Sequence, residues 1–199
     1  MAHAREHDGR RTSPPRAVKR KPPRRPARIE RTAYHEAGHA VAAYVRRLRF
    51  TSISIIPYRG TLGRCEFSET PVVIDLQSRR LGQARRRVET LIIVSLAGVI
   101  AECLLTGRNN WRGAHADLHD AAHYASHVTG SEDELGAYVR WLWEHTRMLL
   151  AAPPCWLAVR DLAAALLEDQ RIGERRARAI ISEAIERGAP KAKRARKRR

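Results

Sequence analysis

Residues 32–41 have the sequence TAYHEAGHAV, and the fold and chemistry expected of the 199-residue chain both follow from this stretch. Small and apolar residues recur at helical spacing through it and beyond it. This predicts a helix that begins at Thr32, a suitable N-cap, and runs to about Leu48. His35 and His39 lie four residues apart in this helix, so both imidazoles project from one face and can bind the same metal ion.

Glu36 follows the first histidine and supplies the other group that a hydrolytic zinc site needs. Its carboxylate can reach a water bound to the metal without taking a coordination position. Zinc lowers the pKa of such a water from 15.7 to about 7. The glutamate can then take the proton of this water and pass it to a departing amine. The His-Glu-x-x-His spacing therefore predicts Zn²⁺ as the cofactor and Glu36 as the catalytic base of a metalloendopeptidase.

A third metal ligand must come from outside this helix, because a catalytic zinc usually has three protein ligands. A metzincin would carry a further histidine at position 45, where this chain has Val45. A carboxylate is a suitable ligand, and Asp117, after a Gly-Ala turn near the start of an Ala-rich helix, is the first candidate. Glu102 is its rival, and His115 or His119 are further alternatives. Glu102 is equally suited to accept a hydrogen bond from a ligand histidine.

Four later segments continue the pattern set by TAYHEAGHAV, in the order ISIIP (53–57), GTLG (60–63), LAGVIAE (96–102) and GAHADL (113–118). Together these segments resemble the FtsH family, the ATP-dependent zinc metalloproteases, and the resemblance covers residues 32–186. It implies a helical zinc-metallopeptidase domain. It also implies that Asp117, which matches the family's ligand aspartate, completes the zinc site with His35 and His39.

The chain as a whole predicts a mainly α fold with one small β element. Two strands, 52–57 and 62–67, are expected to form a hairpin around a turn at 59–61. Ser131 and Glu134 form a capping box that begins a helix, which Pro153-Pro154 should end. Further helices are expected at 76–106, 114–128, 155–168 and 174–187, with Gly188 as the last C-cap.

Positive charge is concentrated at the two ends of the chain. Of the formal net charge of +17, residues 1–31 carry +8 and residues 191–199 carry +7, which leaves +2 for residues 32–190. The N-terminal stretch also has five prolines and almost no large apolar residue, a composition typical of disorder. We therefore predict a disordered basic tail at 1–31, a zinc peptidase domain at 32–187 and a second disordered basic tail at 188–199.

The expected cellular context is the cytoplasm. The three cysteines form no Cys-x-x-Cys pair, which fits a reducing compartment. The most apolar stretch, 91–105, is shorter than the roughly 20 residues of a membrane span, so it predicts a buried helix. No Gly-x-x-x-x-Gly-Lys-[Ser/Thr] run occurs in the sequence. We therefore expect cleavage of flexible or unfolded polypeptides that is not driven by ATP hydrolysis in this chain.

Other partners and functions stay open at this point. A separate ATPase could supply the substrate, and the family's hexameric habit weakly favours a homo-oligomer. The tails could make non-specific polyanion contacts. Two alternatives to catalysis are an idle zinc-binding scaffold and a polyanion-binding protein that acts through its tails. A second metal could bind the histidines that repeat on one predicted helix, but a solvated or stacking face is favoured for His115, His119, His123 and His127.

Overall fold

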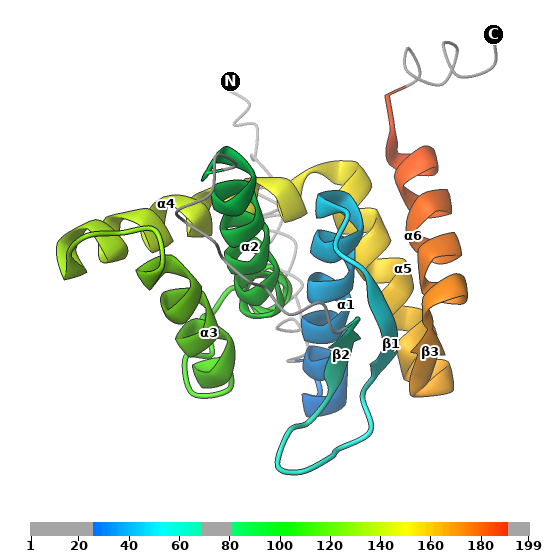
Figure 1. Ribbon diagram of the computed structural model, residues 1–199. Coiled ribbons are helices and arrows are strands. Elements are labelled where there is room, and N and C mark those ends of the chain that lie inside the picture. The colour runs from blue at the N-terminus through cyan, green and yellow to red at the C-terminus, as the bar shows by residue number, and fades with distance from the viewer. Residues whose placement is uncertain (1–25, 69–80, 191–199) are drawn as a thin grey trace, which may run out of the picture.

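The protein is represented by a computed structural model that describes residues 26–68 and 81–190 (Figure 1). This described part is mainly helical with a small sheet, which confirms the predicted fold class. Its elements in chain order are α1 (Arg28–Arg46), β1 (Phe50–Ser54), β2 (Arg64–Phe67), α2 (Leu81–Thr106), α3 (His115–Ser126), α4 (Glu132–Ala151), α5 (Pro153–Asp169), β3 (Arg171–Gly173) and α6 (Glu174–Gly188).

Helices α1 and α2 pack side by side at the centre of the molecule, and their contact is the most extensive between any two elements of the described part. The two backbones approach closely because Gly38 of α1 has no side chain. A Cβ there would lie 2.6 Å from both the Ala101 side chain and the Ala97 carbonyl oxygen of α2. As a result, α2 passes directly behind the histidine-bearing face of α1.

The apolar part of α2 is a buried core helix, as its sequence predicts. Ile92, Leu96 and Val99 are fully buried in the core. The stretch Gly82–Thr106 is long and apolar enough to cross a membrane, but 61% of its most apolar window is buried inside the protein. Buried core helices of soluble proteins can be equally long and apolar. The absence of a membrane span and the cytoplasmic location therefore stay predictions.

The three strands form one antiparallel sheet in the order β2-β1-β3. Ile53 of β1 pairs with Cys65 of β2 on one side and with Ile172 of β3 on the other. The hairpin between β1 and β2 is confirmed, and its turn places Arg59 and Gly60 at positive φ angles of 47° and 88°. Strand β3 was not predicted, because three residues between two helices show no period that distinguishes them from a turn.

Several predicted boundaries are confirmed and others shift. Ser131 caps α4, since its Oγ accepts a hydrogen bond from the Glu134 backbone N–H at 3.2 Å. Thr32 is not an N-cap: α1 begins at Arg28, and the Thr32 hydroxyl donates to the Arg28 carbonyl. The polar residues before Thr32 are good helix formers, so the helix extends back through them. Gly188 is the last residue of α6 rather than its C-cap.

The division of the chain into tails and domain stays a prediction. Residues 1–25 and 191–199 lie outside the described residues, as do residues 76–80 of the helix predicted at 76–106. The described part begins with helix already at Arg28, four residues before the predicted start of the domain.

Candidate active site

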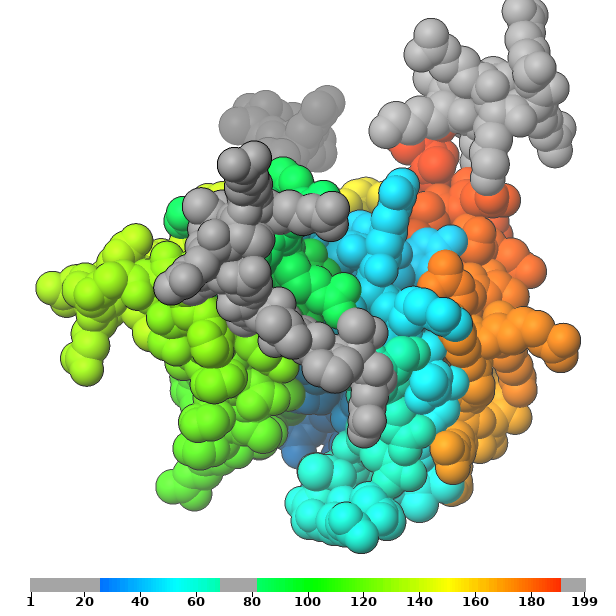
Figure 2. Space-filling model, in the orientation of Figure 1, coloured from blue at the N-terminus to red at the C-terminus, as the bar shows by residue number. Residues whose placement is uncertain are grey.

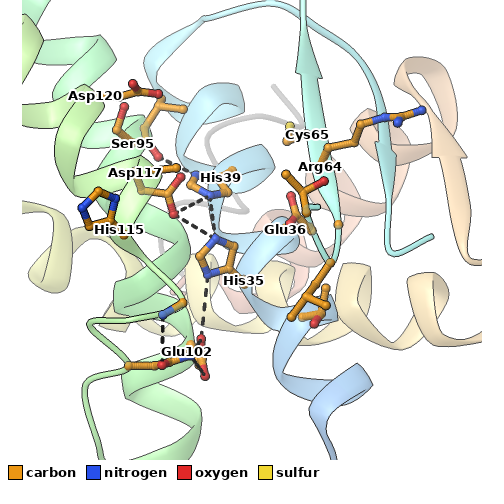
Figure 3. A pocket seen from close by; sticks show the side chains of 18 of the residues that line it. His35, Glu36, His39, Arg64, Cys65, Ser95, Glu102, His115, Asp117 and Asp120 are labelled. Atoms are coloured by element: carbon orange, nitrogen blue, oxygen red, sulfur yellow. Dashed lines mark hydrogen bonds and ion pairs between the residues drawn. The ribbon is translucent and has the colours of Figure 1, made fainter. Parts of the chain in front are cut away.

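Helices α1 and α3 bring His35, His39 and Asp117 together around one point (Figure 3). The Nε2 atoms of the two histidines lie 3.1 Å apart. Oδ2 of Asp117 lies 2.9 Å from Nε2 of His35 and 3.5 Å from Nε2 of His39. Within residues 26–68 and 81–190, no other group of three potential metal-ligating side chains lies as close together.

The spacing of these three atoms suits a zinc ion. Ligand atoms about 2.0–2.2 Å from zinc in a tetrahedral site lie about 3.3 Å from one another. The three separations here, 2.9, 3.1 and 3.5 Å, lie on both sides of that value. Two imidazole nitrogens and one carboxylate oxygen are also a common donor set of catalytic zinc. The site can therefore accept the ion with small adjustments of the side chains.

The second nitrogen of each histidine has its own partner, which orients the ring. Nδ1 of His39 donates a hydrogen bond to the Val94 carbonyl of α2 at 2.7 Å. Nδ1 of His35 lies 3.9 Å from Oε2 of Glu102, so this ring lies between Glu102 and Asp117 (Figure 3). A hydrogen-bonded partner of this kind fixes the tautomer of a ligand histidine, so His39 keeps Nε2 free for a metal. His35 also turns its Nε2 toward Asp117 and its Nδ1 toward Glu102.

Gly98 of α2 makes room for this arrangement. A Cβ at Gly98 would collide with Nε2 of His39 and lie 2.6 Å from Nε2 of His35. The backbone of α2 therefore lies directly against the Nε2 atoms of the two histidines. Any larger residue at this position would displace at least one of the two rings.

Glu36 is buried beside this centre, with 5% of its surface exposed. Burial raises the pKa of its carboxyl group, and nearby Asp117 raises it further, against the opposing effect of His39 and His35. Gly63 of the hairpin closes over it, since a Cβ there would lie 2.7 Å from Oε1 of Glu36. A carboxyl group with a raised pKa is suited to exchange protons near neutral pH.

His39 and Asp117 form a closely interacting pair of titratable groups. Burial lowers the pKa of His39, but the charge and hydrogen bond of Asp117 and the charge of Glu36 together raise it to about 9. Burial likewise raises the pKa of Asp117, and the two histidines outweigh that effect and hold it well below its usual range. The carboxylate is therefore ionised, and a metal cation would take the place of a proton held between these side chains.

The site lies in a cleft of about 850 Å³ between α1, α3 and the hairpin segment that contains residues 60–65. Figure 2 shows α1 at the bottom of a hollow between α3 and this hairpin. His35, Glu36 and Asp117 all line the cleft. The three converging ligand atoms are thus reachable from outside, while the groups behind them are buried.

A sequence model of peptidase family M41 matches residues 25–138, which is more than half of the chain. The chain belongs to peptidase family M41. The match spans α1, α2, α3 and the hairpin, and it confirms the predicted resemblance to the FtsH family of metalloproteases. Membership of M41 also supports a metallopeptidase function. A search of curated proteins found no match.

The other residues considered as ligands lie at different distances from the point where the three ligand atoms converge. Glu102 lies on the Nδ1 side of His35, away from the point where the three ligand atoms converge. His115 lines the cleft. His119 is largely exposed, and the rings of His123 and His127 contact each other edge-on with centroids 4.9 Å apart. That arrangement fits the favoured interpretation of a solvated, stacking face.

Sequence reasoning missed three residues that shape the site, namely Val94, Gly98 and Asn110. Val94 acts through its backbone carbonyl, and no side-chain pattern reports such a contact. Asn110 lies in the predicted break between two helices and contacts Glu102. Gly98 carried a signal, because a glycine in the middle of a helical pattern usually has a packing or functional reason.

Proposed function

We propose that this M41 chain is a zinc-dependent metalloendopeptidase in which His35, His39 and Asp117 hold Zn²⁺. One observation carries the proposal: three ligand atoms from two helices converge at spacings of 2.9–3.5 Å beside the buried carboxyl group of Glu36. Family membership adds the peptidase chemistry. The site combines the donor set, the base and the cleft that such a reaction needs.

A zinc ion at this site would polarise a peptide carbonyl and lower the pKa of an adjacent water toward about 7. Glu36 takes a proton from the attacking water and delivers it to the leaving amine. Burial raises the pKa of this carboxyl group, which favours holding the proton between the two transfers. The Val94 carbonyl keeps the imidazole of His39 oriented, and the Glu102 carboxylate faces the Nδ1 side of His35.

The proposed substrates are flexible or unfolded polypeptides. The metal-binding atoms lie inside a hollow, so a scissile bond reaches them only in a segment that can leave its own fold. Strand β2 is at the edge of the described sheet, and its residues Arg64, Cys65 and Phe67 line the cleft. An extended peptide can add to such an edge through backbone hydrogen bonds. Cleavage of already unfolded segments needs no ATP.

Hydrolysis of a disordered protein such as casein tests the proposal. Purified protein should cleave casein, lose this activity with a strong zinc chelator and recover it when zinc is returned. ATP should have no effect on purified protein, and an ATP-dependent gain on adding cell extract would identify a separate ATPase partner. A folded, zinc-loaded protein that cleaves neither casein nor shorter flexible peptides would instead be a zinc-binding scaffold.

A further inference from the structure

Asn110 lies in the loop between α2 and α3. It contacts Glu102, which lies behind His35, and Gly113, which precedes the helix that carries Asp117. Its Nδ2 donates to the two carboxylate oxygens of Glu102, at 3.1 and 3.3 Å. Its Oδ1 accepts a hydrogen bond from the Gly113 backbone N–H at 3.2 Å. Its own backbone carbonyl accepts one from the Ala114 N–H at 3.1 Å. One side chain thus joins the end of α2 to the start of α3.

The contact with Glu102 matters because that carboxylate is buried, with only 6% of its surface exposed. Its other partners are farther away: Nη1 of Arg31 lies at 3.5 Å and Nδ1 of His35 at 3.9 Å. Asn110 therefore makes the shortest contacts of this carboxylate and fixes its rotation. A carboxylate held in this rotation faces the Nδ1 side of His35.

The contact with Gly113 fixes the other half of the site. Helix α3 begins at His115, and its N-cap residue Ala114 has no side chain that can accept from the free N–H groups of the first turn. Asn110 supplies acceptors for Gly113 and Ala114 just before that turn. The packing is close, because a Cβ at Gly113 would collide with Nδ2 of Asn110. Asp117 lies in the first turn that these contacts hold.

We propose that Asn110 is a positioning residue of the metal site. Its amide holds the Glu102 carboxylate behind His35, and its oxygens fix the turn from which α3 presents Asp117. One side chain thereby helps to set the positions of two ligands, His35 on α1 and Asp117 on α3. The inference rests on the proposed function, since it requires that the site binds a metal.

Zinc affinity of the full chain, measured by competition with a chelator, tests the proposal. Asn110→Ala should weaken zinc binding about tenfold, the lower end of the range for the loss of a group that supports a metal ligand. Asn109→Ala is the matched control, because Asn109 is the neighbouring exposed asparagine. It should bind zinc within twofold of wild type. Equal affinities for Asn110→Ala and Asn109→Ala would overturn the proposal.

Asn110→Asp separates a positioning role from a merely structural one. The aspartate keeps the acceptor for Gly113, but it replaces the donor to Glu102 with a carboxylate that repels it. Zinc affinity should fall at least as far as in Asn110→Ala, whereas Asn109→Asp should leave it unchanged. Wild-type affinity in Asn110→Asp would show that the contact with Glu102 does not position the site. This variant also decides the question if Asn110→Ala does not fold.

A double-mutant cycle of Asn110→Asp, which keeps the acceptor for Gly113, with Glu102→Gln shows whether the amide of Asn110 acts through Glu102. The combined variant should lose little more affinity than either single variant, whereas independent effects would multiply to about a hundredfold. In addition, Co²⁺-loaded Asn110→Asp should show an altered visible spectrum, because the orientation of His35 changes. Additive losses with an unchanged cobalt spectrum would overturn the proposal. Failure of the wild-type chain itself to bind zinc would instead refute the proposed function.

Discussion

Gly98→Ala should remove metal binding while leaving most of the fold intact. The added methyl group would collide with Nε2 of His39 and lie 2.6 Å from Nε2 of His35, whereas carbon and nitrogen atoms normally keep about 3.4 Å. At least one imidazole ring must therefore move by about 0.8 Å or more. Losing the support of a ligand already costs about 10–100-fold in affinity. Displacing a ligand should cost more than about 100-fold.

The effect on folding should be much smaller, because the colliding atoms belong to side chains that can rotate toward the cleft. Overpacking typically costs about 1–3 kcal/mol, and alanine is favoured over glycine inside a helix by about 1 kcal/mol. The net change in the free energy of unfolding of the metal-free protein should therefore stay within about 2 kcal/mol. Denaturant unfolding in the presence of a chelator measures this change.

Two other glycines serve as controls for Gly98→Ala. In Gly82→Ala, also in α2, the new Cβ would meet only Nη1 of Arg86 at 3.8 Å, so zinc affinity should be unchanged. In Gly38→Ala, the collision is with the Ala97 carbonyl of the α2 backbone, so the fold itself should be destabilised. Wild-type zinc affinity in Gly98→Ala would refute the inferred position of the metal.

Three further predictions concern the chemistry and the tails. Glu36→Gln should keep zinc affinity within about threefold and abolish casein cleavage, because the base is lost but no ligand is; near-normal activity would contradict the mechanism. Asp117→Asn should weaken zinc binding, measured against a competing chelator, more than Glu102→Gln does; the reverse order would make Glu102 the third ligand. Deleting residues 1–25 and 191–199 should preserve cleavage of a small peptide and remove salt-sensitive DNA binding, because the tails carry most of the net charge; DNA binding that persists would place a recognition surface on the folded part.

Local patterns in the sequence predicted the elements that carry their own signals. The helical period around residues 32–48 located α1, and the capping box at Ser131 located the start of α4. The turn around Gly60 predicted the hairpin, because a residue with positive φ is needed there. Strand β3 and the first turn of α1 lack such signals, and these are the places where the predicted boundaries fail.

The third ligand could not be settled from residue spacing, because it depends on how α3 packs against α2. Glu102 lies near the end of an apolar helix and Asp117 near the start of an Ala-rich one. Both carry a carboxylate, so chemistry alone allows either of them to be the third ligand. The structure separates them by the nitrogen of His35 that each one faces: Nε2 for Asp117 and Nδ1 for Glu102. Only the tertiary arrangement contains that distinction, although the family resemblance pointed to the same residue.

The proposed metal site explains why two acids are buried in the part of the chain that the structure describes. Glu36 and Glu102 are 5% and 6% exposed; Glu36 lies on α1 under Gly63 of the hairpin, and Glu102 lies on α2 beside Arg31 and Asn110. Burying an ionised carboxylate typically costs several kcal/mol, and partners such as Arg31 and Asn110 offset this only in part. Apolar residues of similar size would fill the same space at lower cost. The close contact of α1 and α2 depends on small residues such as Gly38, and this packing requires neither acid. The proposed roles do require them, Glu36 as the base for proton transfer and Glu102 as the partner of His35, so the proposed metal site accounts for residues that the fold alone does not.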